Sequence, residues 1–80
     1  MATLIKVNGA QSQLKDTNLK TLQDAVGGYI EYAQLADGKV LVVNEEGLLK
    51  KNQKVNYTAS KLYGSTIVGD AVLCNYSELK

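Results

Sequence analysis

The sequence has 80 residues, of which 45% are hydrophobic and 21% charged, and this indicates one small globular domain, residues 1–80. The formal net charge is only +1 and arginine is absent, which argues against a DNA- or RNA-binding surface. Histidine is also absent, so histidine catalysis and the usual Cys/His zinc sites are excluded. We therefore expect no enzymatic activity, no cofactor and no bound metal.

The single cysteine and the hydropathy pattern bear on the compartment. Cys74 has no second cysteine with which to form an intrachain disulfide, as is typical of a reducing environment. No run approaches the roughly 20 apolar residues that span a bilayer. We expect a cytoplasmic protein without a membrane partner, and in the case of a phage gene this means the host cytoplasm.

The first third of the chain predicts a strand, a loop and a helix. Thr3–Asn8 has the β-branched pattern of a strand, with Ile5 and Val7 facing inward. The mostly polar stretch Gly9–Lys15 is typical of a loop. Leucine and valine then recur at helical spacing, which predicts a helix over about residues 18–26. Gly27 and Gly28 follow and end this helix.

The next segment predicts a β-hairpin. Tyr29–Leu35 and Lys39–Asn44 are strand-like, and Asp37-Gly38 between them is a favoured pair for a two-residue type I′ turn. Such a turn places Ala36 opposite Lys39, and therefore Ala33 opposite Val42 and Glu31 opposite Asn44.

This register sorts the hairpin side chains onto two faces. One face then carries Ile30, Tyr32, Leu41 and Val43, and the other carries Ala33, Leu35, Val40 and Val42. A hairpin that is apolar on both faces must be covered on both. We expect the first helix on one face and a second protomer on the other, which predicts a homo-oligomer, at least a dimer.

The last third predicts a connector, a short helix and a strand. After the lysine-bearing connector Leu48–Gln53, Asn56 is positioned to cap a helix over Tyr57–Tyr63. Ala71–Asn75 forms the final strand. The predicted fold is α+β, a small and mainly antiparallel sheet in the order strand, helix, hairpin, short helix, strand, in an oligomeric protein.

Several short runs together resemble a family of small domains. These runs are Leu22-Gln23, Val26-Gly27-Gly28-Tyr29-Ile30-Glu31, Val43-Asn44-Glu45-Glu46-Gly47, Asn56 with Ala59, and Ile67-Val68-Gly69-Asp70. The sequence is similar over about residues 19–75 to phage- and mobile-element-encoded domains of unknown function.

The resemblance implies a function by analogy with phage sponges that blunt host immune signalling. On this interpretation the protein is an anti-CBASS-type sponge that sequesters a cyclic oligonucleotide or a cyclic ADP-ribose type of messenger without cleaving it. The alternative from the residues is a protein–protein interaction module that inhibits a host enzyme through an apolar hairpin face.

The open end of the predicted hairpin is the candidate ligand site. Amides and carboxylates can pair with base edges, tyrosine rings can stack on bases, and lysines or a backbone amide can contact phosphate. The nine candidate residues are Tyr29, Glu31, Asn44, Glu45, Gly47, Lys50, Asn56, Lys61 and Tyr63.

Overall fold

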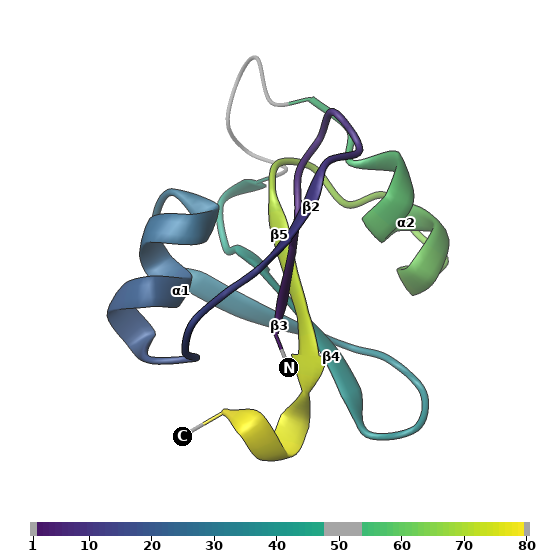
Figure 1. The fold of residues 1–80 in the computed structure, drawn as a ribbon. Coiled ribbons are helices and arrows are strands. Elements are labelled where there is room, and N and C mark those ends of the chain that lie inside the picture. Colours follow the sequence, from purple (N-terminus) through teal and green to yellow (C-terminus); the bar gives the residue numbers. More distant parts are fainter. Residues whose placement is uncertain (1, 48–53, 80) are drawn as a thin grey trace.

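The computed structural model describes residues 2–47 and 54–79. The elements are β1 (Thr3–Ile5), β2 (Gln11–Gln13), α1 (Leu19–Val26), β3 (Ile30–Gln34), β4 (Lys39–Asn44), α2 (Tyr57–Tyr63), β5 (Ala71–Asn75) and the 3₁₀ helix η2 (Tyr76–Glu78). The strands form one antiparallel sheet in the order β2-β1-β5-β4-β3, with α1 and α2 on opposite faces (Figure 1). The predicted α+β class is confirmed. No helix in the described ranges has the length and apolar character to cross a bilayer.

The N-terminal region contains a strand that the sequence did not predict. β2 lies within the segment expected to be a loop, and it pairs with β1 so that Leu4 is opposite Ser12. Its three residues are polar and exposed at the edge of the sheet, so they show no alternation of apolar and polar residues. Val7 lies beyond β1 and is only half-buried, and its N–H donates to Asp70 Oδ1 at 3.0 Å.

The two predicted helices are confirmed at the predicted positions. α1 ends at Gly27, whose φ of 81° is the left-handed conformation that favours glycine. α2 begins after Asn56, whose side chain accepts a hydrogen bond from Ala59 N–H at 3.0 Å. Leu22 of α1 packs in the core formed with β4 and β5, and Ala59 of α2 packs in the core on the opposite face.

The hairpin turn has the predicted conformation. Asp37 and Gly38 both have positive φ, 60° and 73°, and Lys39 N–H donates to Ala36 C=O at 3.3 Å. These features identify a type I′ turn.

The predicted register of the hairpin is nevertheless wrong by one residue. Leu35 N–H donates to Lys39 C=O at 2.9 Å, so Leu35 and Ala36 both lie opposite Lys39. This extra residue is a β-bulge, and it shifts every pair beyond the turn. Ala33 therefore pairs with Leu41 and not with Val42.

The shift changes which side chains share a face, because neighbouring residues of a strand point in opposite directions. Val40 and Val42 lie in the core under α1, with Ile30 packed against it. Leu41, Ala33 and Val43 lie instead in the core under α2. α2 therefore packs on the face for which we expected a second protomer; the oligomeric state itself stays a prediction.

The C-terminal strand is confirmed and continues into a helical turn that was not predicted. Asn75 and Glu78 form a reciprocal capping box at the start of η2. Tyr76 N–H donates to Gly38 C=O at 2.8 Å, which ties the end of the chain to the hairpin turn. The predicted connector Leu48–Gln53 lies outside the described residues.

Candidate functional site

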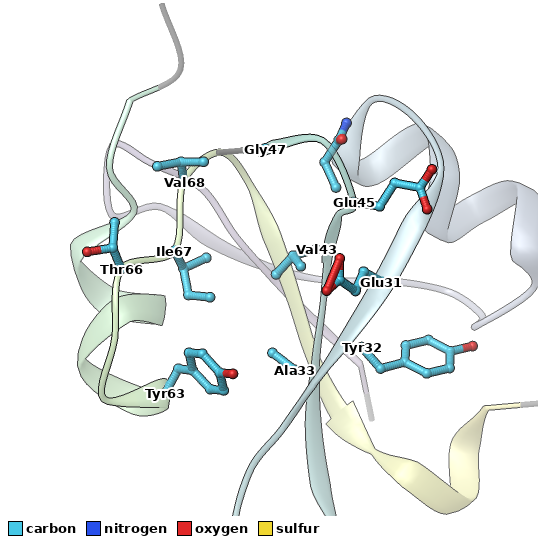
Figure 2. Close-up of a pocket in the computed structure, with 11 residues that line it drawn as sticks. Glu31, Tyr32, Ala33, Val43, Glu45, Gly47, Tyr63, Thr66, Ile67 and Val68 are labelled. Atoms are coloured by element: carbon cyan, nitrogen blue, oxygen red, sulfur yellow. The ribbon is translucent and has the colours of Figure 1, made fainter. Parts of the chain in front are cut away.

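A pocket of about 180 Å³ lies on the α2 face of the sheet. One wall is the open end of the β3–β4 hairpin, and the other is the chain between α2 and β5 (Figure 2). The lining residues are Glu31, Tyr32, Ala33, Val43, Asn44, Glu45, Gly47, Tyr63, Thr66, Ile67 and Val68. We call this pocket the hairpin pocket.

Five of the nine predicted site residues line the hairpin pocket, namely Glu31, Asn44, Glu45, Gly47 and Tyr63. Glu31 and Glu45 have exposed side chains, and the Tyr63 side chain is 42% exposed. Figure 2 shows Tyr63 across the pocket from the hairpin, on the side of α2. The structure therefore brings these five residues together at the open end of the hairpin.

The floor of the hairpin pocket is apolar. Ala33 and Val43 come from the hairpin, and Ile67 comes from the segment before β5. Gly47 allows this segment to approach closely, because a Cβ atom at that position would lie 3.0 Å from Val68 Cγ2. The pocket thus combines a small apolar floor with acidic groups beside it.

Asn44 has a structural role in addition to its place in the wall. It is 7% exposed; its Nδ2 donates to Val26 C=O at 3.2 Å, and its Oδ1 accepts from Glu46 N–H at 2.8 Å. A Cβ atom on Gly28 would lie 2.8 Å from Asn44 Nδ2, so this glycine leaves room for the amide. Asn44 joins the end of α1 to the end of β4, and both of its polar atoms are already bonded.

Asn56 does not reach the hairpin pocket. Its side chain is 0% exposed; Nδ2 donates to the C=O groups of Ile5 and Gly69, at 2.9 Å each, and Oδ1 caps α2. This amide connects β1, α2 and the turn before β5. The structure therefore assigns Asn56 to the core and not to ligand contact.

The remaining predicted residues are dispersed. Tyr29 is 70% exposed and lies beside a separate surface hollow with Gln23 and Asp24, and Lys61 lies on α2 beside Tyr57. Lys50 lies outside the described residues. The single site expected from the sequence is therefore divided among different surfaces.

Among the described residues that line the hairpin pocket, the charged side chains all have one sign. Glu31 and Glu45 contribute carboxylates, and no lysine is among the described residues that line it. Glu46 and Asp24 border the adjacent hollow beside Tyr29. Such a surface attracts a cationic group and repels a phosphate.

Cys74 shows no feature of a catalytic nucleophile. It is buried in the core under α1, and desolvation, followed by the nearby Glu78 carboxylate, raises the pKa of its thiol. Within residues 2–47 and 54–79 we find no cluster of three or more side chains of the metal-binding types His, Cys, Asp and Glu.

Sequence reasoning missed one wall of the hairpin pocket, formed by Thr66, Ile67 and Val68. This segment forms no strand and makes only a single bridge, between Val68 and Val55. The only sequence feature that marks this segment is the apolar pair Ile67-Val68 before Gly69. This pair predicts burial but does not indicate that the segment packs opposite the hairpin.

Comparison with known proteins places most of the chain in one family. A profile described as a domain of unknown function, DUF3846, matches residues 1–78. No curated protein and no solved structure matches the chain. The match confirms the coarser part of our expectation, a family of small uncharacterised domains.

Proposed function

Because the chain belongs to the DUF3846 family of domains of unknown function, we propose a function from its own site. The protein is a non-catalytic interaction module that binds a basic segment of a partner polypeptide at the hairpin pocket. The observation that carries this proposal is the pairing of an apolar floor with two exposed carboxylates, Glu31 and Glu45.

A lysine side chain has the matching chemistry. Its four-carbon stem can lie on the floor formed by Ala33, Val43 and Ile67, while its ammonium group stays near the carboxylates. An exposed ion pair contributes only about 0–1 kcal/mol, so one lysine gives weak binding. We therefore expect the partner to make further contacts beside the pocket.

The proposal is tested with an eight-residue peptide of alternating valine and lysine, acetylated and amidated, titrated by calorimetry. Glu31→Lys and Glu45→Lys should each weaken binding at least tenfold, about 1.4 kcal/mol, because they reverse the charge beside the pocket.

Glu46→Lys is the matched control. It makes the same charge change on a residue that does not line the hairpin pocket, so it should leave affinity within about threefold, roughly 0.7 kcal/mol. Equal losses in all three variants would indicate attraction by net charge alone and would contradict the assigned site. A peptide of alternating valine and glutamate should not bind.

The second candidate is a nucleotide messenger, the ligand implied by the family resemblance. One observation favours it: the half-exposed ring of Tyr63 offers a stacking surface, and Glu31 across the pocket offers an acceptor for a base. The carboxylates oppose it, because a phosphate would meet like charge. A phage origin and a role in evading CBASS signalling belong to this candidate.

Calorimetry against cyclic di- and trinucleotides and cyclic ADP-ribose isomers decides between the two candidates. A Kd below about 10 μM, roughly −7 kcal/mol, that is lost in Tyr63→Ala would replace the polypeptide proposal with the nucleotide one. Absence of binding across the panel, with peptide binding retained, would leave the interaction module.

A further inference from the structure

β3 is the last strand of the sheet, and its outer backbone edge is paired with no strand of the described residues. The hydrogen bonds from Glu45 N–H to Tyr29 C=O, 3.0 Å, and from Leu35 N–H to Lys39 C=O, 2.9 Å, show that the odd-numbered residues face β4. In an antiparallel pair the intervening residues direct their N–H and C=O groups away from that partner. Ile30, Tyr32 and Gln34 therefore point theirs outward, and no described strand takes them up.

Pockets lie on both faces of this same edge. Glu31 and Ala33 line the hairpin pocket on the α2 face. Ile30 and Tyr32 line a second pocket of about 190 Å³ on the α1 face, with Leu19 of α1. Tyr32 borders both pockets, and Figure 2 shows its ring directed away from Tyr63.

We propose that β3 accepts an extended segment of the partner polypeptide as a sixth, antiparallel strand. This inference rests on the proposed function and specifies how the partner is held. The main-chain groups of the added strand bond to Ile30, Tyr32 and Gln34, while its side chains alternate between the two pockets. The antiparallel direction continues the pairing of every neighbour in the sheet.

The chemistry of each face selects the added side chains. On the α2 face the carboxylates of Glu31 and Glu45 favour lysine or arginine. On the α1 face the exposed apolar side chains Leu19 and Tyr32 favour valine, isoleucine or leucine. The occupant is therefore a partner segment in which basic and apolar residues alternate.

The opposite edge of the sheet lacks these features. β2 carries Gln11, Ser12 and Gln13, all exposed and uncharged. It provides neither a carboxylate for a basic residue nor an apolar side chain to bury. Docking is therefore assigned to β3 and not to free sheet edges in general.

Backbone N-methylation of the valine–lysine peptide tests the strand directly. In an antiparallel strand, the residues whose side chains face α1 direct their N–H groups to β3, and these are the valines. N-methylation of the valines should therefore abolish binding, whereas N-methylation of the lysines should change Kd by less than about threefold. Equal effects of the two sets, or the reverse pattern, would overturn the antiparallel strand.

This result is separable from the proposed function. Binding of the unmethylated peptide, and its loss in Glu31→Lys, tests the acidic site whatever the methylated peptides do. If the unmethylated peptide binds and both methylated peptides bind equally well, the acidic site stands and edge pairing fails. If the unmethylated peptide does not bind, the proposed function fails.

A change on the protein provides a second test. Gln34→Pro removes an outward N–H without removing a hydrogen bond to β4, and proline is tolerated at such edge positions. Gln34→Pro should bind the valine–lysine peptide at least fivefold more weakly than Gln34→Ala does. Circular dichroism should show that both variants are folded. Equal affinity of the two variants would contradict edge pairing.

The oligomeric state of the same variants provides a further outcome. If the wild-type chain dimerises and Gln34→Pro abolishes the dimer, the edge of β3 binds a second copy of the chain and the proposal is overturned.

Discussion

Two buried polar side chains, Asn44 and Asn56, each join segments that lie far apart in the sequence. Asn56 is the more deeply placed, since its amide bonds to three backbone groups from β1, α2 and the turn before β5. The short side chain of asparagine carries two N–H donors and one carbonyl acceptor, a combination that no other side chain of the same size has. This explains why an asparagine can occupy a fully buried position in a small core.

We expect Asn56→Asp to destabilise the protein by about 3 kcal/mol or more. The carboxylate keeps the acceptor for Ala59 N–H, but it places negative charge against the C=O groups of Ile5 and Gly69. Urea unfolding followed by circular dichroism measures the change. The matched control is Asn18→Asp, at an exposed N-cap whose side chain makes no capping bond; a loss there as large as at Asn56 would contradict this account.

The buried thiol of Cys74 predicts a pH dependence of stability. Because its native pKa is raised, the folded protein retains the thiol proton to higher pH than the unfolded chain does. The contribution of the thiol to the free energy of unfolding is fully present below the pKa of the unfolded chain, about 8.5. It is lost as the pH rises through the raised pKa of the folded protein. The urea midpoint should fall over this range in the wild type, and the fall should be smaller in Cys74→Ala; identical profiles would show that the thiol is not responsible.

At the scale of elements, the β3–β4 hairpin combines a turn with a bulge. The turn residues Asp37 and Gly38 determine the local backbone, but the bulge at Leu35-Ala36 determines which residues pair. With this register, β4 directs Val42 to the α1 core and Leu41 to the α2 core, and both are fully buried. The pairing is therefore matched to a sheet covered by a helix on each face.

Gly38→Val should cost more than about 1 kcal/mol, because valine at a φ of 73° is strained in the native turn. The control is Ala36→Val, an exposed neighbour without positive φ, which we expect to stay within about 0.5 kcal/mol. Thermal unfolding of both variants is the measurement. An unchanged melting temperature in Gly38→Val would show that the turn adopts another conformation in solution.

At the scale of the whole molecule, a sheet between two helices gives the small chain two apolar cores. One contains Leu22 and Val42 under α1, and the other contains Leu41 and Ala59 under α2. Because each face carries a helix of the same chain, we expect these two cores to form without a second protomer. The hairpin pocket lies between one of these cores and solvent, where a partner can reach it.

Light scattering tests this arrangement. We expect a mass near 8.7 kDa at micromolar concentration, that of one chain. A mass of two chains would restore the dimer expected from the sequence. The free edge of β3 would then be the first place to look for its interface, through the Gln34→Pro variant described above.

The sequence by itself determined the features that depend on neighbouring residues. Helical periodicity with capping residues located α1 and α2, and Asp37-Gly38 located the turn, because caps and turns require particular side chains or positive φ within a few positions. The sequence also located Glu31 and Glu45 at the open end of the hairpin, but the predicted register directed them to opposite faces; the bulge places Glu31 opposite Val43 and so brings both carboxylates to the α2 face.

Only the tertiary structure decided the features that join distant segments. The bulge has no residue signature of its own here, and its shift of register depends on the two helices that bury β4 from both sides. The far wall of the hairpin pocket, Thr66 to Val68, lies beside the hairpin because β5 pairs with β4 and Ile67 packs in the core under α2. Asn56 appeared as a cap from its neighbours, but its full burial against Ile5, 51 positions away, follows from long-range contacts that local pattern does not encode.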